Sequence, residues 1–166
     1  PCPAGGERLL TQGEAELVAS VFGQAIVTPA VRIRRRKWFP LQPHHVVMAP
    51  CGHLHFHPRS ASYCDDFSQG PLHLQGLFLH EMTHVWQAQQ HGLWYLPLHR
   101  PFSRRYDYSL KPGWKLVQYG IEQQAEIVRH AFLLSHGVEV SGAPGLEQYL
   151  SILPFHPNTT GTSHAA

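Results

Sequence analysis

Two histidines and a glutamate with the spacing of a metal site lie in the segment LFLHEMTHVWQ, residues 77–87. His80 and His84 are four positions apart, so on an α-helix they share a face and can bind the same metal ion. Glu81 would point about a quarter-turn away, close enough to reach a water molecule on that ion without binding the ion itself. Charged groups in an apolar run need such compensation. The segment therefore predicts a zinc site with two histidine ligands and Glu81 as general base.

This arrangement predicts hydrolysis of a peptide bond. Zinc lowers the pKa of its bound water to roughly 7, and Glu81 would take the proton as that water attacks the carbonyl carbon, then pass it to the leaving amine. The competing interpretation is chance, because the chain has 14 histidines. Roughly 0.05 accidental HExxH matches are expected in such a composition. Few of those would place charges inside a strongly apolar helix, so the metal site is favoured.

The third zinc ligand must come from elsewhere in the chain, because a catalytic zinc ion has three protein ligands and one open position. The segment YGIEQQAEIVRH, residues 119–130, predicts a second helix on which Glu122 and Glu126 share a face. We expect Glu122 to be the third ligand and Glu126 to orient a ligand histidine through its outer nitrogen. Two alternatives stay open. Glu126 could be the ligand instead, or both glutamates could lie on a solvated face together with Gln123 and Gln124.

These two motifs resemble segments of known bacterial proteins. HEMTHVWQAQ and YGIEQQAEIVRHAF are similar to proteins labelled Vgr-related and to the metallopeptidase-like core domain found with extracellular contractile injection systems, where HELTHVxQQ recurs. The same layout includes LTQGEAELVASVFG, VRIRRRKW and MAPCGHLHFHP, so the resemblance covers roughly residues 10–153. HExxH followed by ExxxE also resembles the glutamate-type zincins, or gluzincins, whose usual second motif is ExxxD.

The resemblance implies a small zinc metallopeptidase with one zinc ion per chain. The zincin motif falls on four residues of this sequence: His80, Glu81, His84 and Glu122. Glu126 takes the position of the residue that supports a ligand in zincins. The implied partners are a peptide or protein substrate and components of a secretion or injection system. By analogy with zincins, an edge strand beside the cleft would pair with extended substrate, and HLHFH, residues 53–57, is the candidate.

Length and charge limit the other possibilities. The chain of 166 residues predicts one domain over 11–153, with a loose segment at 1–10 and a disordered tail at 154–166. A formal net charge of +2 gives no reason to expect nucleic acid or a membrane as partner, and no apolar run is long enough to span a bilayer. We expect the protein to be located in the cytoplasm of a bacterium, from which a specialised secretion system could export it.

Strands are expected before the two longest helices, which predicts an α+β fold. The expected architecture is a small zincin-like domain whose short antiparallel sheet packs on the HExxH helix and on the second, glutamate-bearing helix. Helices are expected at 11–22, 71–90, 121–136 and 146–153, a strand at 29–37, and hairpins at 45–57 and within 93–118.

Four other features have a functional and a structural interpretation each. The alternating histidines of HLHFH could bind a second metal or line the cleft, but a polar, solvated face is favoured. The basic run at 32–37 is favoured as a charged strand edge over a nucleic-acid site. A bridge between Cys51 and Cys64 is the less favoured state of those cysteines. One of the three tyrosines before the second helix could stabilise the oxyanion, but a core position is favoured and none is assigned a catalytic role: Tyr106, Tyr108 and Tyr119.

Two functions are therefore compared. The first is a zinc-dependent peptidase that uses Glu81 as its base. The second is a non-catalytic, metal-stabilised adaptor or assembly domain on a zincin scaffold. Glu81 favours the enzyme, because zinc binding alone does not require a general base.

Overall fold

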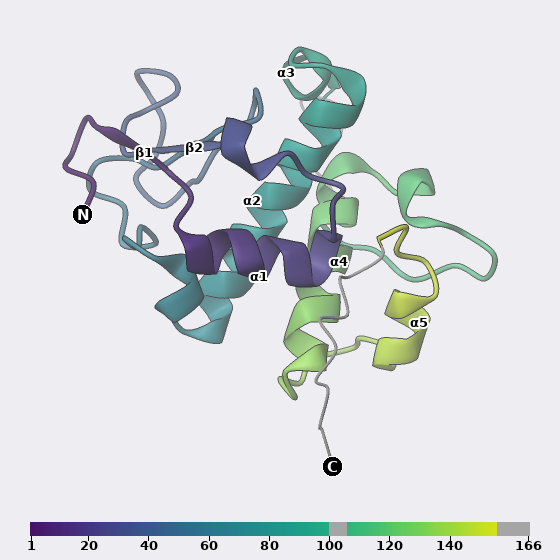
Figure 1. The fold of residues 1–166 in the computed structure, drawn as a ribbon. Helices are drawn as coiled ribbons and strands as arrows, with labels where there is room; N and C mark the ends of the chain where they lie inside the picture. Colours follow the sequence, from purple (N-terminus) through teal and green to yellow (C-terminus); the bar gives the residue numbers. More distant parts are fainter. Residues whose placement is uncertain (100–105, 156–166) are drawn as a thin grey trace.

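Five α-helices and a three-stranded sheet form the part of the chain that the computed structural model describes, residues 1–99 and 106–155 (Figure 1). The strands are β1 (Glu7–Leu9), β2 (Arg32–Arg34) and β3 (Leu54–His55). The helices are α1 (Gln12–Phe22), α2 (Leu72–His91), α3 (Tyr95–His99), α4 (Ile121–Ser135) and α5 (Leu146–Leu150), with 3-10 turns η1 (Thr28–Ala30), η2 (Phe67–Gln69) and η4 (Leu116–Gln118). The expected α+β class is confirmed.

The long helix α2 runs through the middle of the molecule and packs against α4 (Figure 1). Pro71 precedes its first turn, and Gly92 ends it with a φ of 94° that favours glycine. Residues 78–88 are buried without a break, so this stretch of α2 is surrounded by protein on all sides. Any polar side chain within it must find a partner inside the fold.

The sheet lies on the opposite side of the helical core from α5 (Figure 1). β1 pairs antiparallel with β2, and β2 pairs parallel with β3. The predicted antiparallel sheet is therefore wrong, and the sheet is mixed. The hairpin expected at 45–57 is reduced to one antiparallel bridge between Met48 and His55, and β2 pairs with the other side of β3. The segment expected to be loose, 1–10, contributes β1.

A buried carboxylate ties β1, α1 and η2 together. Glu14 closes the predicted capping box with Thr11, and it accepts two hydrogen bonds from Arg8 at 2.7 and 2.8 Å. It also accepts one from the backbone N–H of Phe67 in η2 at 2.9 Å. Its side chain is fully buried, and these contacts satisfy its charge. They fix the segment from which α2 begins.

The other sequence predictions have mixed outcomes. The four expected helices are present as α1, α2, α4 and α5. The hairpin expected within 93–118 is absent from its described residues, which form α3 and η4, while residues 100–105 lie outside the described part. All three cysteines are free, so the Cys51–Cys64 bridge is absent. Of the expected tail, 156–166 lies outside the described residues. Among the described helices, none has the length and apolarity needed to cross a bilayer.

Candidate metal centre

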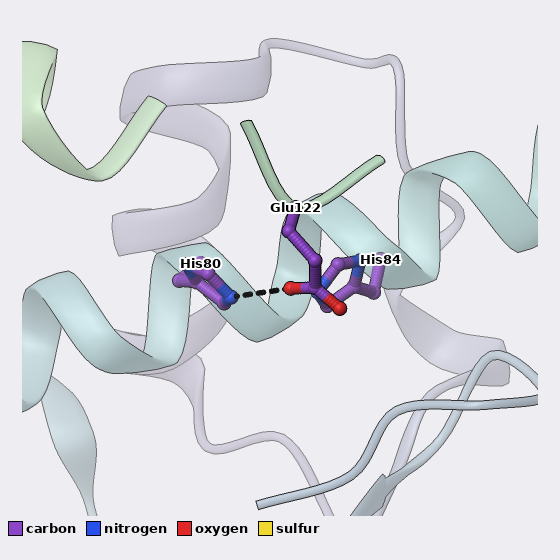
Figure 2. Close-up of side chains that lie close together, drawn as sticks. All are labelled: His80, His84 and Glu122. Atoms are coloured by element: carbon purple, nitrogen blue, oxygen red, sulfur yellow. Dashed lines mark hydrogen bonds and ion pairs between the residues drawn. The ribbon is translucent and has the colours of Figure 1, made fainter. Parts of the chain in front are cut away.

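The helices α2 and α4 bring His80, His84 and Glu122 together in the interior (Figure 2). One oxygen of Glu122, Oε2, lies 3.1 Å from His84 Nε2 and 3.5 Å from His80 Nε2. The three candidate ligand atoms all lie within 4.8 Å of one another, and all three residues are buried. Glu122 is 1% exposed, which excludes the alternative of a solvated glutamate face at this position.

The spacing of these atoms fits a single small cation. Zinc binds nitrogen and oxygen ligands at about 2.1 Å, so two tetrahedral ligand atoms lie about 3.4 Å apart. The separations of 3.1 and 3.5 Å bracket that value. With all three atoms within 4.8 Å of one another, His80, His84 and Glu122 can hold one metal ion together.

A network of two glutamines orients His84. Gln87 lies one turn along α2, and its Oε1 is 2.8 Å from His84 Nδ1. The amide nitrogen of Gln87 donates to Gln124 and to the Ile121 carbonyl, so its oxygen faces the histidine as an acceptor. His84 Nδ1 must then carry the proton, which leaves Nε2 free to bind a metal. The sequence did not point to Gln87, and Gln124 entered only through the less favoured alternative of a solvated helix face. The only signal was a glutamine three residues after a ligand histidine.

His80 has a carboxylate neighbour at its outer nitrogen. Its Nδ1 lies 2.8 Å from Glu126 Oε1, an ion-pair distance, although the ring is turned away from a well-directed hydrogen bond. Burial disfavours charge on His80, but Glu122 and Glu126 outweigh it and raise the His80 pKa to about 9. Burial also opposes the charge on Glu126, yet His130 and His80 lower its pKa well below the usual range. This negative environment favours a cation.

Glu81 is the remaining charged residue of the motif. It is 4% exposed, and its Oε2 has no hydrogen-bond partner within the described part of the protein. Glu81 and His80 line a cavity of about 410 Å³, together with the segment 45–47 and Tyr106. A buried carboxylate oxygen without a partner is costly unless something polar occupies the space beside it.

We expect the metal-free protein to become less stable as the pH rises from about 6.5 to about 9, the ordinary and folded pKa values of His80. The folded state binds the His80 proton more tightly, so its contribution is complete below the unfolded pKa and is lost through the folded pKa. Urea unfolding at a series of pH values, with a chelator present, measures this. His80→Gln should flatten the curve. An equally steep curve in that variant would assign the effect to other groups.

The histidines of HLHFH lie apart from this centre. His55 and His57 are 4% and 5% exposed, so the predicted solvated face is wrong. Burial, followed by the charge of Arg34, lowers the pKa of His55 to about 4 and keeps it neutral. At His55 the segment has pairing partners on both sides, so it is not the open edge strand expected from the analogy. The segment that lines the cavity is 45–47.

The basic run has partners of its own. Glu7 accepts from Arg34 and Arg36, each at 3.1 Å, across the β1–β2 pair. The guanidinium of Arg35 lies 4.7 Å from the ring centre of Tyr63. The favoured interpretation of this run as a strand edge is nevertheless wrong, because β2 is the central strand and pairs with β1 on one side and with β3 on the other.

Two comparisons place the chain beside known proteins. It is 44% identical over 133 residues to the type VI secretion system spike protein VgrG2b of Pseudomonas aeruginosa, a match that covers 76% of this chain and 13% of the relative. It is also similar to the solved structure of the effector domain of P. aeruginosa VgrG2b, with a TM-score of 0.71 and 37% identity. That match covers 90% of this chain and 86% of the solved one. No protein-family model matches the chain.

Proposed function

The chain belongs to the family of the VgrG2b effector domain, and from this premise we propose that it is a zinc-dependent metallopeptidase domain. The observation that carries the proposal is the buried group of His80, His84 and Glu122 beside an unpartnered oxygen of Glu81. Two imidazoles and one carboxylate form a ligand set typical of catalytic zinc, and this set leaves one position open.

Each residue of the site has a separate role in the proposed hydrolysis. His80 and His84 offer Nε2, and Glu122 offers Oε2, to the metal ion. When bound, zinc would supply a Lewis acid that polarises a carbonyl and lowers the pKa of water. Glu81 would orient the attacking water, accept its proton and deliver that proton to the leaving amine. The three ligand residues are buried, and the low dielectric around them strengthens each of these interactions.

An adaptor function explains Glu81 less well. A metal ion that served only to stabilise the fold would need no extra carboxylate, yet Glu81 is buried beside the ligands at the cost of a missing hydrogen bond. The cavity next to it also gives a substrate a route to His80 and Glu81. Both features support the enzyme over the adaptor.

The proposed setting is a type VI secretion system. VgrG2b is described as a spike protein, and this chain matches only 13% of its length. We place the chain as an effector domain that is carried by secretion components and acts on a peptide or protein substrate, with no nucleic acid or membrane as partner. Its proposed route is synthesis in the bacterial cytoplasm followed by export.

Purified protein should contain about one zinc ion per chain. Elemental analysis before and after dialysis against a chelator measures this, and zinc should be restored in the same ratio on titration. Hydrolysis of a broad peptide library should disappear with the metal and return with it. Protein that contains no transition metal and takes up none on titration would contradict the proposal.

A further inference from the structure

A row of polar side chains leads away from the candidate metal centre, starting at Glu126. His130 Nε2 lies 3.2 Å from Glu126 Oε2, one turn along α4. On the other side of the same ring, His130 Nδ1 is 2.6 Å from the hydroxyl of Tyr108, which precedes η4. The Tyr108 hydroxyl is in turn 2.8 Å from that of Tyr149 in α5. Together with the contact between Glu126 and His80, these contacts join four segments in one chain: α2, α4, the segment with Tyr108, and α5.

The polarity of this chain follows from the carboxylate. An ionised Glu126 can only accept, so the 3.2 Å separation of its Oε2 from His130 Nε2 favours the tautomer with the proton on Nε2. In the neutral ring Nδ1 is an acceptor, so Tyr108 donates to it and accepts from Tyr149. Tyr149 is 1% exposed, so the protein holds most of its ring in a fixed position. Burial, and then the contact with Tyr149, raise the pKa of Tyr108, which keeps it protonated.

The position of the Glu126 carboxylate depends on this chain. Arg129 donates to Oε1 at 3.3 Å, the same oxygen that faces His80. The Arg129 side chain is 33% exposed, so water competes for it and it restrains Glu126 weakly. His130 is the group that contacts the other oxygen, Oε2. A contact at each oxygen fixes the rotation of the carboxylate about its last bond, which a contact at one oxygen does not.

We propose that His130 and Tyr108 are positioning residues for the metal centre, anchored by Tyr149. They hold Glu126 so that Oε1 stays at His80 Nδ1, which keeps Nε2 of His80 directed at the metal site. This inference rests on the proposed metal-binding role of His80. It assigns a task to α5, because the hydroxyl of Tyr149 is the outer end of the chain.

The test uses the purified 166-residue chain and zinc alone as the probe. His130→Phe keeps a ring but removes both nitrogens, and Tyr108→Phe removes only the hydroxyl. Zinc affinity, measured by competition with a chromophoric chelator, should fall about 10-fold in His130→Phe, the low end for losing an outer contact. Tyr108→Phe should lose less. His130→Gln, whose amide can still donate to Glu126, should recover part of the loss.

Tyr119→Phe is the matched control. Tyr119 packs beside Tyr108, but its hydroxyl accepts from the backbone N–H of Lys111 and lies outside the chain of contacts. It should keep wild-type zinc affinity even if unfolding measurements show a similar loss of stability. Wild-type zinc affinity in folded His130→Phe, or an equal fall in Tyr119→Phe, would overturn the inference.

A second readout is independent of zinc. In metal-free protein the ring NMR signal of His80 should shift in His130→Phe, because the Glu126 carboxylate at 2.8 Å then moves relative to the ring, and it should stay at its wild-type position in Tyr119→Phe. If the wild type binds no zinc but this change occurs, the metal-site proposal fails and the positioning role stands. If zinc binds while the signal is unchanged by His130→Phe, the positioning role fails alone.

Discussion

Glu81→Gln should reduce peptide hydrolysis by at least about 10²-fold, the usual scale for losing a general base. Glutamine keeps the size of the side chain but cannot take a proton. Glu81 is not among the three residues that converge on the candidate metal position, so zinc content and the free energy of unfolding should stay close to wild type. The separation of these quantities identifies a catalytic loss, because damage to the fold would lower all of them together.

The assay for this variant needs a broad substrate. A narrow preference would make a single peptide appear uncleaved, so a peptide library with mass-spectrometric detection comes first. Glu147→Gln provides a matched control, because Glu147 is an exposed glutamate on α5, and its rate should equal wild type. Wild-type turnover in Glu81→Gln would rule out the proposed base, even with zinc bound.

Glu122→Ala should weaken zinc binding by more than the 10–100-fold that loss of an outer contact usually costs. Glu122 supplies the only carboxylate of the candidate ligand group, and alanine leaves two neutral imidazoles to hold a divalent ion. Glu126→Ala should lower the zinc affinity by about 10–100-fold, because the Glu126 carboxylate contacts the outer nitrogen of His80.

Gln123→Ala is the control for Glu122→Ala, since it removes a polar side chain from the adjacent position of α4. The Gln123 amide donates to the Asp107 carbonyl and is not part of the ligand group. Chelator competition should give wild-type affinity in this variant. Equal zinc affinities in Glu122→Ala and Gln123→Ala would show that Glu122 is not a ligand. A larger loss of affinity in Glu126→Ala than in Glu122→Ala would make Glu126 the ligand and Glu122 the supporting residue.

The helical part of the candidate site could be predicted because its rules are local. A spacing of four residues places His80 and His84 on one face wherever the helix lies. Pro71 and Gly92 mark its ends by their own backbone preferences. The pairing of α2 with α4 is long-range and has no such local signal. The chemical need of the two histidines for a carboxylate partner was what pointed to Glu122.

The sheet could not be predicted in the same way. β3 has only two residues, and the alternation of HLHFH does not show which segments of the protein will lie beside it. The alternating histidines predicted a solvated face, but neighbouring segments cover it. Gln42 donates to the His55 carbonyl, and Trp38 packs edge-on against the His55 ring. Strand pairing depends on contacts far apart in the sequence, and these decide burial more than the pattern does.

The amides around His84 were missed for a related reason. Gln87 and Gln124 are typical solvent-facing residues by composition, and only the packing of α2 on α4 turns them inward. Glutamine can donate and accept at once, so it can link a histidine to a backbone carbonyl within a buried interface. Polarity in a helix therefore did not separate a solvated face from an orienting network.

A crystal structure of the zinc-loaded protein, with anomalous diffraction recorded at the zinc edge, tests the metal centre most directly. We predict a single strong peak between His80, His84 and Glu122, with these three protein ligands and a water molecule within hydrogen-bonding reach of Glu81. A fourth protein side chain in the place of that water would favour a structural metal and the adaptor function. A peak elsewhere, with His80 and His84 free, would contradict the metal centre itself.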